Sequence, residues 1–276
     1  MNQFNQENTQ LFTLLGQSYE CCHFIEKSLQ IGEYSLSFSQ VTNIVQPKLN
    51  ETNALCRFHL SHQQSNQQSH QLQLKAEEIT GFLESKYSHF KIRASLLDRP
   101  LVLALEHPLY IPPQSQSYLK LSRPIAFELI AYNADEEFKL LLNPTKALRV
   151  TSYGLVTQPM LCYHWLASTS EQPIDGNEAL VPMVIQNQSK QVIELRKLTL
   201  YKGFLKLYKN DSYFVTNEVN LKLTSKQEGF LEYLDEPPSQ YGICELLYEH
   251  TGETSTKLLK LLRLVGKRGT GIEYGL

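Results

Sequence analysis

The stretch from Val181 to Leu223 constrains the fold of this chain more than any other part of the sequence. Apolar residues recur in it at every second position, in short runs separated by residues that favour turns. A strand directs successive side chains to opposite faces of its sheet, so this period indicates half-buried strands rather than helices. In the clearest run, Leu221 and Leu223 alternate with Asn220 and Lys222. We therefore expect strands joined by short turns into an antiparallel meander with one buried face.

Similar runs, punctuated by proline and glycine, occur along most of the chain and predict a mainly β fold. A few segments instead have helical spacing, among them Ile79 to Tyr87. A length of 276 residues favours two domains over one. Because prolines interrupt a hydrogen-bonded ladder, we place the boundary near Pro113. The expected architecture is two antiparallel β-sandwich-like domains with a few short helices: an N-terminal β-rich domain at 1–113 and a C-terminal sandwich-like domain at 114–276.

Composition narrows the classes of function. A net charge of -2 provides no broad field for nucleic acid or for an anionic membrane. No apolar run approaches the roughly 20 residues of a transmembrane helix, and the first residues do not resemble a signal peptide. The five cysteines, with Cys21 and Cys22 adjacent, form a poor disulfide framework. We therefore expect a cytoplasmic protein without a transmembrane segment, and the absence of any cofactor motif predicts no bound cofactor.

Three blocks of sequence carry a resemblance to a known family. They are PLVLALEHPLYIPPQSQSYLKLSRPIAFELIAY from Pro100, SYGLVTQPMLCYHW from Ser152 and VPMVIQNQSKQVIELRKLTL from Val181, followed by the terminal IEYGL. In this order they resemble the uncharacterised family known as domain of unknown function 432. The family tends to have an arginine before the closing aromatic residue of the second block, where this chain has His164, so no role of that arginine carries over. The resemblance implies a β-rich protein with no established activity. Some members are encoded beside small mechanosensitive channels, which implies a membrane channel as one partner to consider.

The most prominent aromatic and basic cluster in the sequence consists of Arg149, Tyr153, Tyr163, His164 and Trp165. Arginine, tyrosine and tryptophan are favoured at recognition surfaces, so these residues form the candidate recognition surface. The opposing interpretation is structural, because the only tryptophan of a β protein usually fills a core with its N–H on a carbonyl.

Two patterns of histidine and cysteine are candidates for a metal or catalytic site. His59 and His62, with His70 beyond, would suit zinc if they lay on a helix, but their Gln- and Ser-rich surroundings favour solvated histidines. The pair Cys22 and His23 places a thiol beside an imidazole, although neighbours in a strand point apart. We predict no metal site and no catalytic residue. The remaining cysteines are interpreted as buried and unreactive: Cys56, Cys162 and Cys244.

The segment from Lys257 to Lys267 mixes leucines with basic residues. As an amphipathic helix it could rest on a membrane or on the acidic surface of a partner. The preferred interpretation is a capping helix or a strand whose leucines complete the core.

Taken together, the sequence favours a non-enzymatic binding or accessory protein that recognises an unknown protein partner through a β-sheet face or edge. One alternative is a hydrolase or metalloenzyme whose site assembles from distant segments. Another is a peripheral membrane or channel-associated accessory protein. The oligomeric state stays open.

Overall fold

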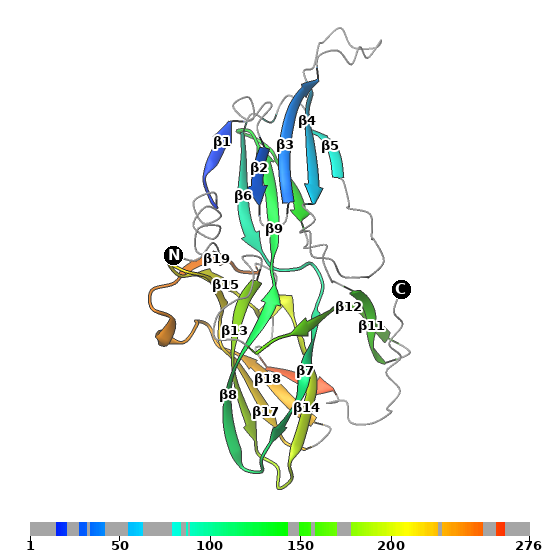
Figure 1. The fold of residues 1–276 in the computed structure, drawn as a ribbon, viewed down its shortest axis with the longest axis vertical. Coiled ribbons are helices and arrows are strands. Elements are labelled where there is room, and N and C mark those ends of the chain that lie inside the picture. The colour runs from blue at the N-terminus through cyan, green and yellow to red at the C-terminus, as the bar shows by residue number, and fades with distance from the viewer. Residues whose placement is uncertain are drawn as a thin grey trace, which may run out of the picture. The chain divides into compact units, whose positions relative to one another are not determined.

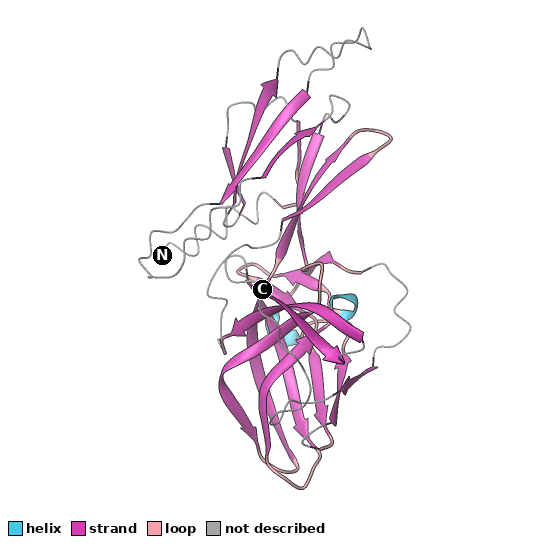
Figure 2. Cartoon of the chain, turned by 90° about the vertical axis from the view of Figure 1, so that its right-hand side faces the viewer, coloured by secondary structure: helices cyan, strands magenta, loops and turns pink. Residues whose placement is uncertain are grey.

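The structure, a computed structural model, describes residues 15–20, 28–31, 34–41, 55–62, 79–83, 87, 89–142, 149–155, 158–169, 178–225, 228–250 and 258–262. Its regular structure is almost entirely β, which confirms the predicted fold class (Figures 1 and 2). Helical structure in these ranges is limited to two 3-10 turns, η2 (Lys202–Phe204) and η3 (Ser239–Tyr241). None of the helices in the described part of the chain has the length and apolarity to span a bilayer.

Contacts divide the chain into two compact units. The first unit contains residues 1–94 and 126–145, and the second contains residues 95–125 and 146–276. The chain therefore passes between the units more than once. Pro113, near which the sequence predicted a boundary, lies inside the second unit.

The first unit contains two four-stranded sheets. One has the order β1-β6-β9-β10 and the other the order β2-β3-β4-β5. The strands of the first sheet are β1 (Ser18–Glu20), β6 (His89–Ser95), β9 (Ala126–Tyr132) and β10 (Glu137–Leu142). Those of the second sheet are β2 (Ser28–Ile31), β3 (Tyr34–Val41), β4 (Leu55–His62) and β5 (Ile79–Leu83). Burial alternates along strand β6, so this sheet has one buried and one exposed face. Phe90, Ile92 and Ala94 are buried, whereas the residues between them are partly exposed.

The helix predicted from Ile79 is wrong, because Ile79–Leu83 forms β5 and pairs antiparallel with β4. Gly81 lies opposite Phe58 in this register. A glycine inside a short segment weakens a helix, and β-branched residues such as Ile79 and Thr80 favour strands over helices. Pairing with a neighbouring strand therefore prevailed over the helical spacing of a few apolar residues.

The second unit contains a four-stranded sheet with the order β11-β12-β7-β14. Its strands are β7 (Leu101–Ile111), β11 (Arg149–Leu155), β12 (Gln158–Ala167) and β14 (Ile193–Leu200). A larger sheet has the order β19-β15-β16-β13-β17-β18-β20, with β8 also paired to β13. Its strands are β8 (Ser115–Pro124), β13 (Glu178–Asn187), β15 (Leu207–Lys209), β16 (Phe214–Thr216), β17 (Val219–Leu223), β18 (Glu228–Tyr233), β19 (Glu245–Tyr248) and β20 (Leu258–Leu262).

The strands expected between residues 181 and 223 are present, and the sequential neighbours β15 and β16 pair antiparallel as expected. The predicted antiparallel meander is wrong for the rest of the stretch. The consecutive strands β13 and β14 belong to different sheets, and β13 pairs parallel with β17, with Met183 opposite Val219. Nearly every residue of β13 is buried, so both faces of this strand are covered. Such a strand belongs in the middle of a sheet, where β8 flanks one side and β16 and β17 flank the other.

A buried asparagine directs the chain from β13 into the other sheet. The Nδ2 atom of Asn187 donates to the carbonyl oxygens of Ile111, Pro112 and Gln191 at 2.8–2.9 Å. Its Oδ1 atom accepts hydrogen bonds from the backbone N–H of Ser189 at 2.9 Å and from the Ser189 hydroxyl at 2.7 Å. One side chain therefore fixes the β13–β14 turn to the turn that joins β7 and β8.

Candidate functional site

A pocket of about 320 Å³ opens on the outer face of the larger sheet of the second unit. Its floor lies on β8 and β13, where the register places Tyr118 opposite Val184 and Lys120 opposite Pro182. These four residues share one face, because side chains opposite each other in a ladder point the same way. The walls come from segments far apart in the sequence: Thr169, Glu218, Gln240 and Tyr241.

The aromatic ring of Tyr241 holds one wall of the pocket in place. Tyr241 ends η3 and packs in a buried cluster with Leu180, Tyr208 and Val215. The hydroxyl of Tyr208 donates to the carbonyl oxygen of Asp235 at 2.7 Å, which fixes the loop leading into η3. This small core covers part of the outer face of the sheet and leaves the pocket beside it.

A second buried asparagine, Asn217, positions another wall of the pocket. The Oδ1 atom of Asn217 accepts a hydrogen bond from the backbone N–H of Lys206 at 2.9 Å, and its Nδ2 atom donates to the carbonyls of Phe204 and Leu234. The next residue, Glu218, is held through its backbone, because its carbonyl accepts from the N–H of Leu234 at 2.9 Å. The bend between β16 and β17 therefore presents Glu218 to the pocket from a fixed backbone.

The carboxylate of Glu218 is the uncompensated charge of the pocket. The residue is half-buried, and burial raises its pKa above the ordinary value of 4.5. Within the described residues, no side chain forms a hydrogen bond or an ion pair with this carboxylate. Lys120 also lines the pocket, with its Nζ atom 6.0 Å from the centroid of the Tyr241 ring. The pocket therefore combines aromatic surface with a negative charge that has no counterion among the residues that the structure describes.

The pocket adjoins an open edge of the sheet. Strand β8 pairs with β13 along its whole length (Figure 1). On its other side, the backbone partners among the described residues are confined to its second half, where Leu121 bridges Thr169 and the N–H of Ser122 donates to Ser168 at 3.1 Å. In that part of the chain, no strand pairs with this side of residues 115–120. The ring of Tyr118, on this open half, is 77% exposed.

The residues of the predicted recognition surface lie on β11 and β12. Arg149 is opposite His164 in the register, and Tyr153 is opposite Met160. Positions 149, 153 and 164 therefore share one face of this sheet, whereas Tyr163 and Trp165 lie on the other face. The five residues therefore lie on two neighbouring strands but are divided between the two faces of the sheet. A recognition role for them stays a prediction.

Of the two aromatic residues on the second face, Tyr163 has local partners, whereas no hydrogen bond of the Trp165 indole is formed within the described residues. The hydroxyl of Tyr163 donates to Asp98 Oδ1 at 2.9 Å, and burial together with this carboxylate raises the pKa of Tyr163 to about 12. The guanidinium of Arg99 lies 5.6 Å from the centroid of the Tyr163 ring. The indole N–H of Trp165 is buried and has no hydrogen-bond partner among the described residues. Tyr163 is thus engaged by its own neighbours.

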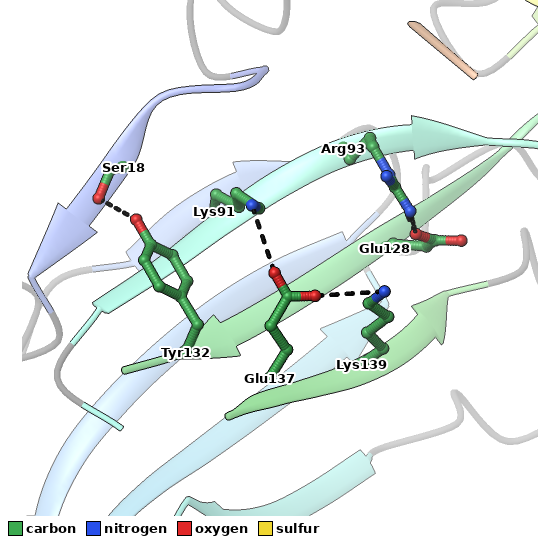
Figure 3. A network of polar contacts seen from close by, with 7 residues as sticks. All are labelled: Ser18, Lys91, Arg93, Glu128, Tyr132, Glu137 and Lys139. Atoms are coloured by element: carbon green, nitrogen blue, oxygen red, sulfur yellow. Dashed lines mark hydrogen bonds and ion pairs between the residues drawn. The ribbon is translucent and has the colours of Figure 1, made fainter. Parts of the chain in front are cut away.

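The outer face of the β1-β6-β9-β10 sheet in the first unit carries a network of paired charges (Figure 3). Arg93 donates through both Nε and Nη2 to Glu128, and Glu137 contacts Lys139 at 3.2 Å and Lys91 at 3.8 Å. The hydrogen bond from Lys139, followed by its charge and those of Lys91 and Arg93, lowers the pKa of Glu137. Each charge drawn in Figure 3 has a partner of opposite sign, which is typical of a stabilised, solvated sheet face.

The histidine and cysteine candidates do not form a site in the described part of the chain. His59 and His62 lie on strand β4, where positions three apart face opposite sides, so the helical geometry considered for zinc does not exist. Among the described residues, no group of three or more His, Cys, Asp and Glu side chains could hold a metal ion. The other members of these patterns lie outside the described residues: His70, Cys21, Cys22, His23 and the side chain of Cys56.

Two other sequence interpretations can be placed. Cys162 is buried as expected, and burial raises the pKa of its thiol to about 11, which agrees with an unreactive thiol. Cys244 is only half-buried, so its expected place in the core is wrong, although burial also raises the pKa of its thiol. The helix considered for Lys257 to Lys267 is wrong over Leu258–Leu262, which forms β20 and pairs antiparallel with β18. The rest of that segment lies outside the described residues.

Sequence reasoning missed the pocket residues. One local signal was present at Glu218: three adjacent polar residues, Thr216 to Glu218, separate Val215 from Val219 and mark a bend between strands. Nothing in the sequence relates that bend to Tyr118 or to Tyr241.

Comparisons with known proteins add a family and no activity. A family model described as "Protein of unknown function (DUF432)" matches residues 26–261. No curated protein and no solved structure matches the chain.

Proposed function

The chain belongs to the DUF432 family of proteins of unknown function, and from this premise we propose that it is a non-enzymatic binding protein that recognises an extended segment of a partner protein at β8. The observation that carries this proposal is the coincidence of an open strand edge and a pocket. Residues 115–120 lack a strand on one side among the described residues, and Tyr118 and Lys120 of the same half-strand line the pocket.

An open edge supplies affinity through the backbone. It presents N–H and C=O groups to which an extended segment can add as a further strand. Successive side chains of such a segment alternate between the two faces of the enlarged sheet. Every second side chain would therefore lie on the pocket side, which provides a route to specificity. The exposed ring of Tyr118 offers the apolar contact that such interfaces favour.

The lining of the pocket favours binding over hydrolysis. Among the described residues that line it, there is one carboxylate, Glu218, and neither histidine nor cysteine. General acid–base and nucleophilic mechanisms use a pair or triad of reactive groups held within hydrogen-bond reach of each other. A single carboxylate beside a lysine and two tyrosines is better suited to holding a charged or aromatic group of a partner.

Site-specific photo-crosslinking in the native cell tests the proposal. Replacing Tyr118 with p-benzoylphenylalanine should trap a distinct partner protein. The matched control is Tyr110, an equally typical surface tyrosine that is 64% exposed and lies on β7 of the other sheet. The same partner trapped from both positions, or a second copy of this chain trapped from Tyr118, would contradict the proposal. Size-exclusion chromatography with light scattering identifies the second case independently.

Proline substitution then asks whether the backbone edge itself is used. In an antiparallel pair, adjacent residues direct their N–H groups to opposite sides of the strand, so one of Gln116 and Ser117 points its N–H away from β13. Proline at that position removes a hydrogen bond to the partner while keeping the ladder to β13. The variant of the two that keeps the melting temperature of the wild type should bind the trapped partner about tenfold more weakly or worse. Unchanged affinity in that variant overturns edge recognition.

A further inference from the structure

We propose that the pocket beside β8 receives a basic side chain, arginine above all, and that Glu218 is its counterion. The pocket and its charge stand on their own geometry. Only the statement that this side chain belongs to the segment added at β8 rests on the proposed function.

The charge of the pocket favours a cation. Glu218 is the only carboxylate among the lining residues, and it has no ion pair or side-chain hydrogen bond within the described part of the chain. Lys120, the other charged lining residue, has interactions of its own, among them the contact with the ring of Tyr241. The charge left to be satisfied is therefore negative, and an arriving cation would pair with a partly desolvated carboxylate, where such a pair is stronger than in water.

The shape and the aromatic lining favour arginine within this class. A volume of about 320 Å³ accommodates one long side chain but not a large ligand. The planar guanidinium can bind a carboxylate through two parallel hydrogen bonds and can stack on an aromatic ring. The lining offers both kinds of partner, because Glu218 lies with Tyr118 and Tyr241 around one pocket. A lysine ammonium would keep the ion pair and lose the paired hydrogen bonds and the stacking.

The site is also preorganised. Asn217 fixes the backbone next to Glu218 with three hydrogen bonds, and Tyr241 is anchored in a buried cluster. The hydroxyl of Tyr118 accepts a hydrogen bond from Gln116 Nε2 at 2.6 Å, which limits the positions of its ring. A pocket whose walls are already fixed loses less entropy when its ligand arrives.

Titration of the full-length chain with N-acetyl-arginine amide tests the inference without knowledge of the partner. Two-dimensional NMR should show saturable shifts at residues of the pocket with a Kd on the order of 1 mM, which is typical of so small a ligand. N-acetyl-citrulline amide has nearly the same shape without the charge, and it should bind at least about tenfold more weakly. N-acetyl-lysine amide should fall between them. This comparison uses the wild-type protein and does not depend on any variant.

Two variants localise the effect. Glu218→Gln should remove the difference between the arginine and citrulline probes. Glu232→Gln is the matched control, since Glu232 lies on the same sheet and is already paired with Lys222 at 2.8 Å; it should leave both affinities unchanged. Equal binding of the two probes to the wild type, or an arginine affinity that is the same in Glu218→Gln, overturns the inference.

The outcome separates the two proposals. If Tyr118 crosslinks to a partner and the arginine probe does not distinguish itself from citrulline, the basic-side-chain inference fails while edge recognition stands. If the probe binds as expected and no partner is trapped, the pocket is a cation site and the strand-addition proposal fails.

Discussion

Two sheet surfaces of this protein differ in whether their charged side chains have partners of opposite charge. On the β1-β6-β9-β10 sheet of the first unit, Arg93 is paired with Glu128, and Glu137 is flanked by Lys91 and Lys139 (Figure 3). On the β8–β13 face of the second unit, Glu218 is half-buried in a pocket and has no paired cation among the described residues.

The difference is that the charges of the first surface are paired within the protein, whereas the carboxylate of the second surface is not paired within the described residues. Cross-strand ion pairs stabilise a sheet modestly and leave little for a partner to satisfy. A carboxylate that loses part of its hydration without gaining a counterion destabilises the folded protein. Carboxylates with a perturbed pKa cluster at functional sites, which favours the pocket over the charged network as a binding site.

The largest change in the free energy of unfolding is expected from removing the side chain of Asn217, which supports the backbone beside the pocket. Asn217→Ala leaves the N–H of Lys206 and the carbonyls of Phe204 and Leu234 without their partner. Because Asn217 is only 1% exposed, the free energy of unfolding should fall by about 2–4 kcal/mol in urea titrations.

The control for this change lies in the first unit. Asn133 accepts hydrogen bonds from the N–H groups of Asp135 and Glu136 at an exposed turn, so water can replace its side chain. Asn133→Ala should cost less than about 1 kcal/mol. Equal losses in the two variants would show that Asn217 is not a buried anchor.

Replacing the buried arginine of the second unit, Arg123, should change the free energy of unfolding by a smaller amount and in the opposite direction. Arg123 is 2% exposed, burial lowers its pKa to about 10, and its Nη1 atom has no hydrogen-bond partner in the described part of the chain. Replacing a poorly satisfied buried charge with an apolar residue of similar length is often stabilising. Arg123→Met should therefore raise the free energy of unfolding by about 1–3 kcal/mol.

The matched substitution in the first unit should do the reverse. Arg93→Met removes the partner of Glu128, whose side chain is only 13% exposed, and should lower the free energy of unfolding by about 1 kcal/mol. A loss of stability in both variants would mean that Arg123 is better satisfied than its surroundings indicate, and the contrast between the units would then be limited to Glu218.

Period-two patterning predicted the elements of this fold because alternation reports which face of a strand is buried. The strands expected between Val181 and Leu223 are confirmed. Alternation does not report which strand lies alongside. The parallel pairing of β13 with β17 depends on contacts between segments more than 30 residues apart, so a meander of sequential neighbours was the wrong topology.

The candidate site was out of reach for a related reason. Tyr118, Glu218 and Tyr241 are ordinary residues in ordinary local contexts, and only the arrangement of strands in the larger sheet brings them to one pocket. The cluster that was visible in the sequence was dense because its residues are close along the chain. In a strand, however, neighbours such as Tyr163 and His164 point to opposite faces, so the five positions are divided between the two faces of the sheet, and a recognition role for them stays a prediction.

The smallest effect gives the most direct test of the contrast, because the two carboxylates should respond to pH with opposite signs. The pKa of Glu137 lies below its ordinary value of 4.5, so around and below that pH the unfolded chain binds more protons, and stability is lost as the pH falls. The pKa of Glu218 lies above 4.5, so the folded chain binds more protons there, and stability is lost as the pH rises through the folded pKa. At pH 7, Glu137→Gln should therefore lower the melting temperature and Glu218→Gln should raise it, each by on the order of 1 °C. Both differences should vanish in acid, where the carboxyl groups are protonated in the folded and unfolded states alike.

Carboxyl carbon NMR titration measures the same contrast at each residue, with Glu137 titrating below pH 4.5 and Glu218 above it. A Glu218 carboxylate that titrates below 4.5 would mean that it already has a cationic partner, and the pocket would then be as complete as the network in the first unit.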